Sequence, residues 1–423
     1  MNIWILQTGE PLPSDNEKSR PMRAINLANS FLERGHNVVI FSSAFYHQKK
    51  SFRKISSYYE MINSNNLKTI LLSSCGYKKN IGFMRLFDHF LLGFNLYRFL
   101  LSQKLPRPDC VFIGYPPIET AYVMSRFALK NQIPIILDVK DLWPEIFLSY
   151  LPNPFRKLFK YLLFPYFSMA KYLFKNVHSI SSISNSFLNH VLLSVRRTRS
   201  KYDYVLPLVK PPTSSHCIHL PESSKPDIWW SKKGVDLSVN NRIVFVGTIS
   251  QAFDFSQLSV AMKYFSSQNI SIELVICGDG EQLVNVQNLF QGCSNVVFPG
   301  WIDNDQTASL MQSSIATVAP YRNTDDFMMS IPNKILDSFS YGLPVITGLR
   351  GEVRDLINKY NVGLYCEDDP NSWIDSVLLL LTNPDLRDLQ AANSLSLSRD
   401  CFEFAKVYSS FCSHVERLVN NGK

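Results

Sequence analysis

Short runs of apolar residues alternate, over most of the chain, with longer segments in which apolar residues recur at helical spacing. Residues 22–32 show the helical pattern, and Gly35 stands where such a helix would end. The short runs of the first half are Ile3–Leu6, Val38–Phe41, Thr69–Leu72, Cys110–Ile113, Ile133–Leu137 and Ser179–Ile183. Strands that are apolar throughout and separated by helices indicate a parallel sheet covered on both faces.

The alternation stops after Tyr204 and restarts near residue 241. Five prolines, several serines and no clear period mark residues 206–240, which we interpret as an interdomain connection, partly packed through Trp229 and Trp230. The runs that follow are Ile243–Val246, Ile272–Ile276, Val296–Phe298, Ile315–Val318 and Pro344–Ile346. The pattern predicts two doubly wound α/β units, which bind ligands at the carboxyl ends of their strands and form a cleft where they face each other.

Composition supports two folded domains. The 423 residues are 46% hydrophobic and 18% charged, which excludes a disordered or fibrous chain. The eight cysteines are scattered and form no C-x-x-C pair, so neither a disulfide scaffold nor a zinc site is expected. This use of cysteine suits a reducing cytoplasm. The two most apolar stretches, 82–101 and 158–174, are interrupted by charges, whereas a membrane span needs about 20 largely uncharged residues.

The net charge of +8 conceals a division between the two halves. Residues 1–215 hold 28 Lys and Arg against 12 Asp and Glu, a net +16, and the remainder holds 15 against 23, a net −8. Between Glu145 and Asp203 there are nine bases and no acid. At about 100° per residue, Lys160, Lys171 and Lys175 share one helical face among many aromatic residues, although Pro165 must kink or split the helix.

Two interpretations of this basic face stay open. It is either a surface that lies on anionic lipid or the solvated face of an ordinary domain helix. No nucleic-acid-binding motif accompanies it, so nucleic acid is not an expected partner.

The most informative segment is residues 330–346. Pro332 suits the first turn of a helix, Gly342 its end, and Leu343–Ile346 the next strand. Free amides at that helix start, together with Lys334, form an anion site for a diphosphate, and Asp337 is placed to accept hydrogen bonds from a sugar diol. The alternative is an ordinary helix with a proline in its first turn and a solvated lysine.

This segment resembles the P-x-K-x-x-E and A-x-G-x-P-V-I pattern of the group 1, or family four, retaining nucleotide-sugar glycosyltransferases, which have the GT-B fold. The resemblance extends along nearly the whole chain, in order, at Arg23 with Leu27–Ala28 and Gly35–Val38, at Cys277–Gly280, and at Gly351–Glu352 with Asn361–Leu364. Asp138–Glu145 is similar to the D-V-R-D-L-W-P of a bacterial surface-polysaccharide subgroup that includes N-acetyl-fucosamine transferases.

The resemblance implies a donor site on the C-terminal domain and an acceptor site on the N-terminal one. It implies that Lys334 neutralises phosphate, that Asp337 takes the role of the family's second acid on the ribose, and that glycines let the backbone approach the ligand. The donor residues carried over by position are Gly247, Thr248, Gly278, Asp279, Gly280, Trp301, Ile302, Arg322, Ser330, Ile331, Lys334 and Asp337.

The sequence departs from the family pattern at two places. Met329 stands where many members have a first acid that touches the transferred sugar, so backbone amides of Met329–Ile331 are expected to replace it. The usual Arg and Lys after the first strand of the C-terminal domain are absent from Gly247–Asp254, which leaves diphosphate neutralisation to Lys334 and Arg322.

Candidate catalytic groups follow a strand of the N-terminal domain. Asp141, and after it Asp138, are the candidates to orient the acceptor hydroxyl or accept its proton, and His47 is expected on the acceptor side with the lysines of the basic face. Asp303–Asp305 imitates a D-x-D metal motif, but its place after a strand predicts a helix N-cap, and the fold class implies no metal or other cofactor. Gly278–Gly280 lacks the remaining glycine and acid of a nicotinamide fingerprint.

The resemblance implies a retaining hexosyltransferase that moves a sugar from a UDP-linked donor to a lipid-linked or oligosaccharide acceptor during surface-polysaccharide (O-antigen or capsule) assembly. We expect it in the cytoplasm, peripheral on the inner face of the plasma membrane. The predicted divisions are an acceptor domain 1–205, the connection 206–240, a donor domain 241–395 and a last helix within 396–423 that packs back across the junction. The alternatives are a nucleotide-sugar epimerase of the same fold and a non-catalytic lipid-binding protein with a degenerate donor site.

Overall fold

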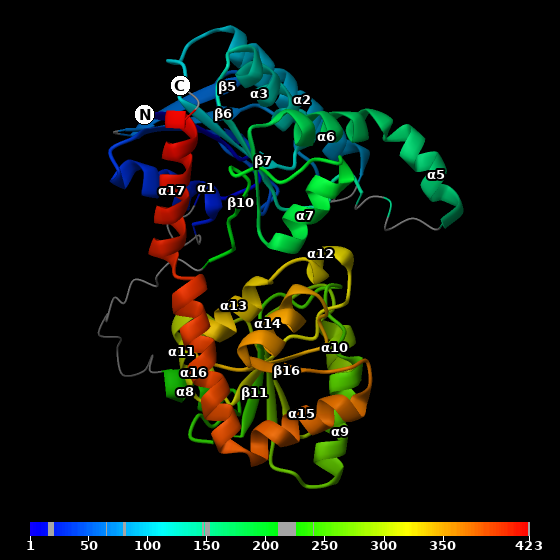
Figure 1. Cartoon of the computed structure of the whole chain (residues 1–423). Coiled ribbons are helices and arrows are strands. Elements are labelled where there is room, and N and C mark those ends of the chain that lie inside the picture. The colour runs from blue at the N-terminus through cyan, green and yellow to red at the C-terminus, as the bar shows by residue number, and fades with distance from the viewer. Residues whose placement is uncertain are drawn as a thin grey trace. The chain divides into compact units, whose positions relative to one another are not determined.

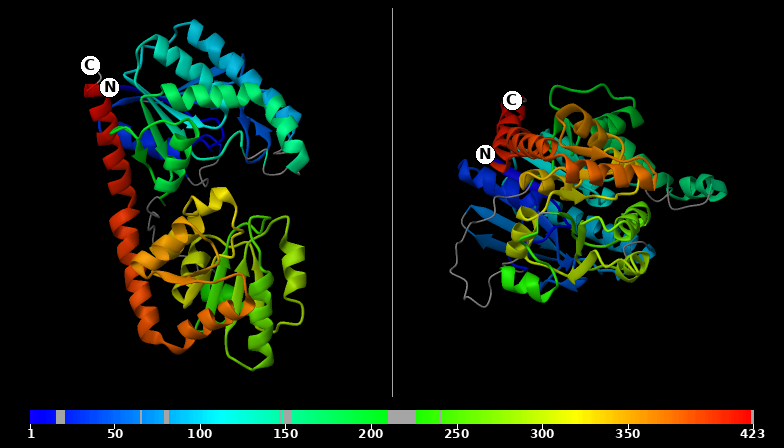
Figure 2. Two further views of the ribbon diagram at one scale, coloured as in Figure 1. Left: turned by 45° about the vertical axis from the view of Figure 1, so that its right-hand side comes forward. Right: turned by 90° about the horizontal axis from the view of Figure 1, so that it is seen from below.

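The computed structural model describes residues 1–15, 21–64, 66–78, 82–145, 148, 153–209, 226–239 and 241–421. Contacts divide the chain into two compact units, the first comprising Met1–Pro207 with Ala405–Lys423 and the second Leu208–Phe404 (Figure 1). Of the predicted connection, residues 210–225 and 240 lie outside the described residues. Both units are layered α/β structures, as the sequence pattern predicts (Figure 2).

The first unit is built on an eight-stranded sheet. In spatial order its strands are β10 (Tyr204–Val205), β9 (Ser179–Ser182), β8 (Ile135–Val139), β7 (Cys110–Tyr115), β1 (Asn2–Leu6), β2 (Asn37–Ser43), β6 (Leu67–Leu72) and β5 (Tyr59–Ser64). All pairs are parallel except β5 with β6. The six apolar runs are all strands. The pattern did not predict β5, because this edge strand is polar and partly exposed, nor the hairpin of β3 (Phe45–Tyr46) and β4 (Ser51–Phe52).

Helices complete the first unit. α2 (Phe83–Leu101) packs on α3 (Ile118–Lys130), which in turn packs on α6 (Phe164–Asn176). The other described helices are α1 (Arg23–Glu33), α5 (Asn153–Leu162), α7 (Asn185–Ser194) and α17 (Phe404–Asn421). Pro165 lies in the first turn of α6, two residues after Leu163, where α5 and α6 are divided, which confirms that the helix is split here.

The last helix, α17, packs on this first unit. The Asn26 amide and the Tyr408 hydroxyl lie 3.4 Å apart, Glu416 pairs with Arg34 at 3.1 Å, and Phe411 meets the ring of Phe112 edge-on.

The second unit is built on a six-stranded parallel sheet. Its order is β13 (Val296–Gly300), β12 (Glu273–Cys277), β11 (Arg242–Val246), β14 (Ala316–Val318), β15 (Val345–Thr347) and β16 (Gly363–Tyr365). All five apolar runs predicted for this half are strands. The helices are α8 (Pro226–Lys232), α9 (Ser256–Ser267), α10 (Leu283–Leu289), α11 (Asn304–Gln312), α12 (Asp325–Met328), α13 (Asn333–Ser340), α14 (Glu352–Tyr360), α15 (Pro370–Thr382) and α16 (Pro384–Cys401).

Two fold features bear on the sequence predictions. Trp230 of α8 is fully buried in the second unit, and its indole N–H donates to the Ser309 hydroxyl at 3.0 Å. The described helices include none with the length and apolar character that crossing a membrane requires.

Candidate active site

At the carboxyl edge of the second unit's sheet, the surface at the ends of β11 and β12 is formed by backbone atoms. Gly247 and Gly278 follow these strands with φ of +138° and +129°, a region that side chains rarely adopt. The Gly247 amide donates to the Cys277 carbonyl at 2.9 Å, and a Cβ on Gly278 would lie 2.1 Å from the Gly247 carbonyl oxygen. The two loops are therefore so close that Gly278 has no room for a side chain.

Lys334, in the first turn of α13, reaches this edge. Its ammonium donates to the Val246 carbonyl at 2.7 Å and lies 4.8 Å and 5.4 Å from the ring centres of Phe245 and Phe253. A Cβ on Gly247 would fall 1.5 Å from Nζ, so the glycine makes room for the lysine. Burial lowers the Lys334 pKa to about 8, against the opposing effect of Asp337. An anion bound here would favour the charged ammonium.

Asp337 lies one turn further along α13. It lines a cavity of about 50 Å³ together with Lys334 and Tyr341. Burial, together with the negative charge of Asp337, raises the pKa of Tyr321 well above its ordinary value. The structure thus brings Gly247, Lys334 and Asp337 together.

The loops after the neighbouring strands lie at the same edge. The Gly278 amide donates to the Gly300 carbonyl at 2.8 Å, which places Trp301 beside Gly278. Trp301 is 73% exposed, whereas Ile302 is buried in the core below. Thr248 and Asp279 are exposed, and a Cβ on Gly280 would lie 2.3 Å from the Ile249 carbonyl oxygen.

Arg322 is placed differently from Lys334. Its guanidinium pairs with Asp254 at 2.9 Å and donates to the Gln251 carbonyl at 3.1 Å, so it holds the loop that follows β11. The side chain is 53% exposed. Its charge is already shared with a carboxylate, whereas the Lys334 ammonium reaches the glycine loops.

The structure argues against the expectation that backbone amides of residues 329–331 replace the missing first acid. The Met329 amide donates to the Asp325 carbonyl at 3.1 Å, and the buried Ser330 donates its amide to the Phe327 carbonyl at 3.2 Å. Both amides close the last turn of α12 and are not directed at a ligand. Ile331 is half-buried between α12 and α13.

Asp303 is the N-cap of α11, as predicted. Its carboxylate accepts from the Gln306 amide and the Gln306 side chain accepts from the Asp303 amide, each at 2.9 Å, which forms a capping box. Within the described ranges no group of three or more His, Cys, Asp and Glu is arranged to hold a metal ion.

The first unit holds a larger cavity, of about 290 Å³, at the carboxyl edge of its own sheet. The loops after β1, β2, β7 and β8 contribute to it, together with α2. Asp141 and His47 line it. The other polar or charged lining side chains are Gln7, Thr8, Glu10, Ser43, Tyr77, Arg85, Asp88, His89, Tyr115 and Lys140.

Two histidines of this cavity are uncharged at neutral pH. Burial, with the charges of Lys50 and Arg85, lowers the His47 pKa to about 4. Burial, with Arg85 and His47, lowers the His89 pKa to about 3. The Tyr77 hydroxyl lies 2.6 Å from Nδ1 of His47. Burial is the larger cause of both shifts, and the nearby positive charge of Arg85 acts in the same direction.

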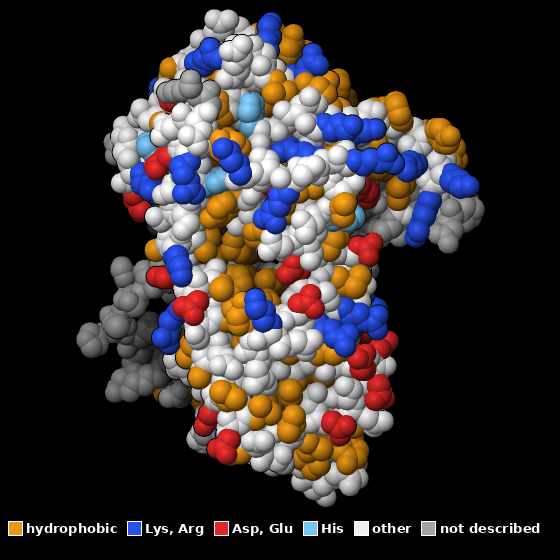
Figure 3. Space-filling view, in the orientation of Figure 1, with side chains coloured by type: hydrophobic (Ala, Val, Ile, Leu, Met, Phe, Trp, Pro, Cys, Tyr) orange, Lys and Arg blue, Asp and Glu red, His pale blue; other side chains and the backbone are white. Residues whose placement is uncertain are grey.

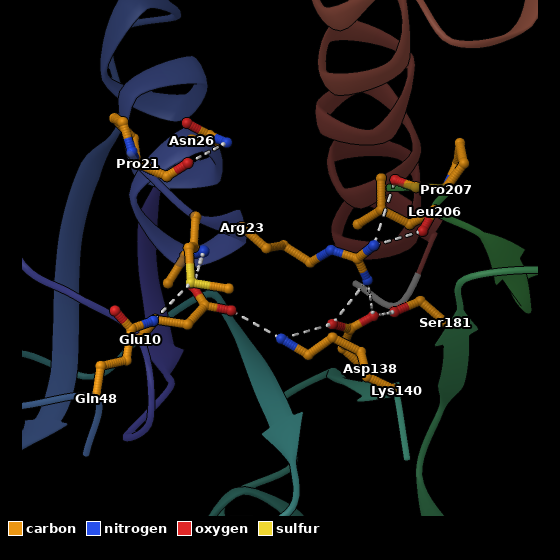
Figure 4. Close-up of polar contacts among 12 residues, drawn as sticks. Glu10, Pro21, Arg23, Asn26, Gln48, Asp138, Lys140, Ser181, Leu206 and Pro207 are labelled. Atoms are coloured by element: carbon orange, nitrogen blue, oxygen red, sulfur yellow. Dashed lines mark hydrogen bonds and ion pairs between the residues drawn. The ribbon is translucent and has the colours of Figure 1, made fainter. Parts of the chain in front are cut away.

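Asp138 does not line the cavity. It is fully buried at the end of β8, where Arg23 of α1 donates to both of its carboxylate oxygens at 2.7 and 2.9 Å and the Ser181 hydroxyl donates at 2.8 Å (Figure 4). Arg23 also donates to the Leu206 carbonyl at 2.7 Å. This arrangement points to a structural role for Asp138, and Asp141 remains the candidate for contact with an acceptor.

Lys140 joins this ion pair to the cavity. Its ammonium donates to Glu10 at 2.8 Å and lies 3.9 Å from Asp138 (Figure 4). Glu10 also accepts from the Ala24 amide at the start of α1 at 2.8 Å. The buried network thus fixes the backbone that carries Asp141.

Sequence reasoning did not identify Arg85, Asp88, His89 and Leu92 as cavity residues. They recur at spacings of three, one and three along α2, so they share the face that lines the cavity. Three polar residues on one face of a mostly apolar helix were a partial signal in the sequence, which marks the face but not the cavity that it lines.

The predicted basic residues lie on two helices. Lys160 belongs to α5, and Lys171 and Lys175 lie one turn apart on α6; all three are exposed. Because α5 and α6 are separate helices, the angular arithmetic for one continuous helix does not apply across the break.

Comparisons with known proteins agree with the architecture. Residues 240–383 match the family model described as Glycosyl transferases group 1. No curated relative matches the chain.

Several solved structures are similar over almost the full length. Sucrose-phosphate synthase from Thermosynechococcus elongatus is 14% identical, with a TM-score of 0.69 and 99% of each chain covered. HepE from Anabaena, in complex with UDP and glucose, is 11% identical, with a TM-score of 0.61, 99% of this chain and 100% of that chain covered. WaaG, a glycosyltransferase involved in lipopolysaccharide biosynthesis, is 14% identical, with a TM-score of 0.59, 97% of this chain and 99% of that one covered.

At such low identity these structures establish the fold and nothing more about the chemistry. The chain therefore has the GT-B fold of glycosyltransferases, and its second unit contains a domain that matches the group 1 glycosyl transferases.

Proposed function

We propose that this protein is a retaining glycosyltransferase that moves a hexose-type sugar from a nucleotide diphosphate sugar to a lipid-linked or oligosaccharide acceptor. The observation that carries the proposal is the Lys334 ammonium, 2.7 Å from the Val246 carbonyl, at an edge where Gly247 and Gly278 leave the backbone bare. A diphosphate suits such a site, because it accepts hydrogen bonds from amides and needs a cation. The family match over residues 240–383 covers this edge.

A UDP-linked donor is the preferred choice. The HepE structures similar to this chain are described as complexes with UDP, with UDP and glucose, and with UDP-glucose. In our proposal Asp337 accepts hydrogen bonds from the ribose diol, Trp301 and Ile302 hold the base through their backbone, and Lys334 neutralises the diphosphate.

The transfer step that we propose is a single substitution on one face of the anomeric carbon. The bond between the anomeric carbon and the phosphate oxygen breaks, and the acceptor oxygen bonds to the same face of that carbon. The acceptor proton passes to the departing phosphate, so the products are the nucleoside diphosphate and the glycosylated acceptor. In this scheme Asp141 orients the acceptor hydroxyl, and no metal or other cofactor takes part.

The acceptor is proposed to bind in the 290 Å³ cavity of the first unit, with His47 and Asp141 in its wall. Surface-polysaccharide assembly at the inner face of the plasma membrane is the proposed setting, with Lys160, Lys171 and Lys175 facing anionic lipid. The likeness to WaaG, which is described as involved in lipopolysaccharide biosynthesis, supports this setting.

A panel of nucleotide sugars tests the donor site. At least one UDP-sugar should raise the melting temperature saturably, and Lys334→Ala should remove that response because the diphosphate loses its cation. Lys359→Ala is the matched control, since Lys359 is an exposed lysine of α14 in the same unit. A panel without any response would refute the proposed donor site.

Product analysis separates the enzyme alternatives. A glycosyltransferase releases UDP and consumes acceptor, whereas an epimerase changes the sugar of the donor without an acceptor. A non-catalytic lipid-binding protein would do neither and would give no donor-dependent thermal shift. The composition of surface polysaccharide in cells with and without this chain would identify the sugar.

A further inference from the structure

Helix α2 exposes a continuous apolar stripe that the fold leaves uncovered. Its residues follow one another at spacings of four and three, and each side chain is 46–78% exposed. They are Phe83, Phe87, Phe90, Phe94, Tyr97 and Leu101. A helix in the surface layer of a domain normally exposes polar residues on this side, so the stripe requires an occupant.

The opposite side of the same helix lines the first unit's cavity. Arg85, Asp88 and His89 face the cavity, and the exposed Phe83 and Met84 lie in the same turn as Arg85. The Arg85 guanidinium lies 4.8 Å from the ring centre of Trp143. One helix therefore separates an exposed apolar surface from a cavity whose wall includes the cations Arg85 and Lys140.

The charge around the stripe has a single sign. α2, α3 and α6 form one packed row of helices, and their exposed charged side chains are Arg98, Arg126, Lys130, Lys171 and Lys175. The two acids of these helices, Asp88 and Glu119, are buried. Figure 3 shows hydrophobic side chains at the rim of the molecule over α2 and Lys and Arg side chains over α6. A bilayer with anionic headgroups matches both properties at once, because aromatic side chains enter its interface and bases meet its phosphates.

We propose that the α2 stripe, flanked by the bases of α3 and α6, docks on an anionic lipid bilayer, and that the cavity behind it receives the phosphate-bearing headgroup of a lipid-linked acceptor. The second half rests on the proposed function, because it names the acceptor of that transfer. The first half adds the α2 stripe to the membrane setting of that function, and it does not depend on donor binding or on transfer. The two sides come closest at the first turn of α2, where the exposed Phe83 and Met84 lie beside Arg85 of the cavity wall.

Vesicle sedimentation of the full chain tests the docking surface. The wild-type protein should sediment with vesicles of mixed phosphatidylcholine and phosphatidylglycerol and much less with phosphatidylcholine alone. The combined variant Phe87→Ser, Phe90→Ser, Phe94→Ser should bind at least tenfold more weakly. Val260→Ser with Val284→Ser is the matched control, since both valines are exposed on helices of the second unit.

Two further outcomes would overturn the docking proposal. Unchanged sedimentation of the triple variant would place lipid contact elsewhere, for example on α5 alone. A wild-type dimer that becomes monomeric in the triple variant, by light scattering, would identify the stripe as an interface between copies. The thermal response to a UDP-sugar without vesicles should be the same in the triple variant and the wild type, so failure of docking and failure of the donor site are distinguishable.

Octyl phosphate in titration calorimetry tests the cavity, with octanol as the uncharged control. Octyl phosphate should bind the wild type and bind Arg85→Gln at least tenfold more weakly, while octanol binds neither measurably. Equal binding of octyl phosphate to Arg85→Gln and wild type would overturn the assignment of the cavity to a phosphate headgroup.

Discussion

The carboxyl edge of the first unit's sheet is lined mainly by side chains, whereas that of the second unit's sheet is formed mainly by backbone. In the first unit the edge is a cavity of about 290 Å³ with a wall of polar and ionisable side chains, and two of its histidines have pKa values of about 4 and 3. In the second unit the edge is a close approach of backbone at Gly247 and Gly278, with Lys334 as its buried cation. A side-chain wall can be specific for one ligand, whereas bare amides and a cation suit a group that many ligands share, such as a diphosphate.

This comparison makes the first unit the more sensitive to loss of a side chain. Arg23 and Asp138 are only 4% and 0% exposed, so removing one partner leaves a buried charge. We expect Arg23→Ala to lower the free energy of unfolding by about 3–5 kcal/mol. Urea unfolding followed by a probe in the first unit measures it, because the two units need not unfold together.

The double variant Arg23→Met, Asp138→Leu separates the cost of an unpaired buried charge from the loss of the network's role in positioning Asp141. It should recover most of the lost stability, since neither charge remains, yet should still transfer sugar more slowly, because Lys140 and the backbone of Asp141 lose their support. Full recovery of both stability and activity would show that the network has no positioning role.

The second unit should instead be sensitive to the addition of a single carbon. Gly278→Ala would place a Cβ 2.1 Å from the Gly247 carbonyl oxygen in a backbone conformation with φ of +129°. We expect a destabilisation on the order of 1–3 kcal/mol and loss of the thermal response to the donor, because the loop that carries Gly247 must move.

Gly292→Ala is the control for backbone strain alone. Gly292 also has positive φ, at +85°, but a Cβ at this position would have no atom within 4 Å of it. The variant should lose some stability and keep its donor response. Loss of that response in both variants would mean that strain in the unit, rather than the close approach at Gly278, controls donor binding.

The sequence predicts the strands of both sheets better than the cavity residues. A strand buried on both faces must be apolar along its length, so all eleven predicted runs are strands, whereas the polar edge strand β5 was missed. Lys334 and Gly247 could be paired through the family resemblance. Arg85 and His89 could not be assigned to the cavity in this way. Its wall comes from seven separate segments, and which residues line it depends on how those segments pack, which periodicity does not record.

The same limit applies to Asp138 and Asp141. Both lie in one motif at the end of one strand, and only packing separates them: Arg23 comes from α1, 115 residues away, to bury Asp138. A motif thus locates a functional edge without saying which of its acids faces the ligand.

Donor binding should depend on pH through Lys334. Its pKa in the free protein is about 8, and a bound diphosphate raises it, so donor affinity is full below pH 8 and falls as pH rises through 8. The fall should approach tenfold per pH unit, about 1.4 kcal/mol. Calorimetry in buffers of different ionisation enthalpy should detect proton uptake near pH 8, and Lys334→Met should show neither effect. A wild-type affinity that does not change between pH 7 and 9 would contradict this.

The smallest effect is expected at Asp303, on the second unit's exposed surface. Asp303→Ala removes the side chain that accepts from the Gln306 amide, so the free energy of unfolding should fall by about 1 kcal/mol, the usual cost of a lost N-cap. Donor response and transfer should be unchanged, with or without a chelator, because the carboxylate caps α11 and binds no metal in our proposal. Asp303→Ser should restore the stability, since serine also caps helices. Loss of transfer in Asp303→Ala that added Mg²⁺ or Mn²⁺ restores would instead make this acid a metal ligand, and the second unit's edge would then depend on side chains as the first unit's does.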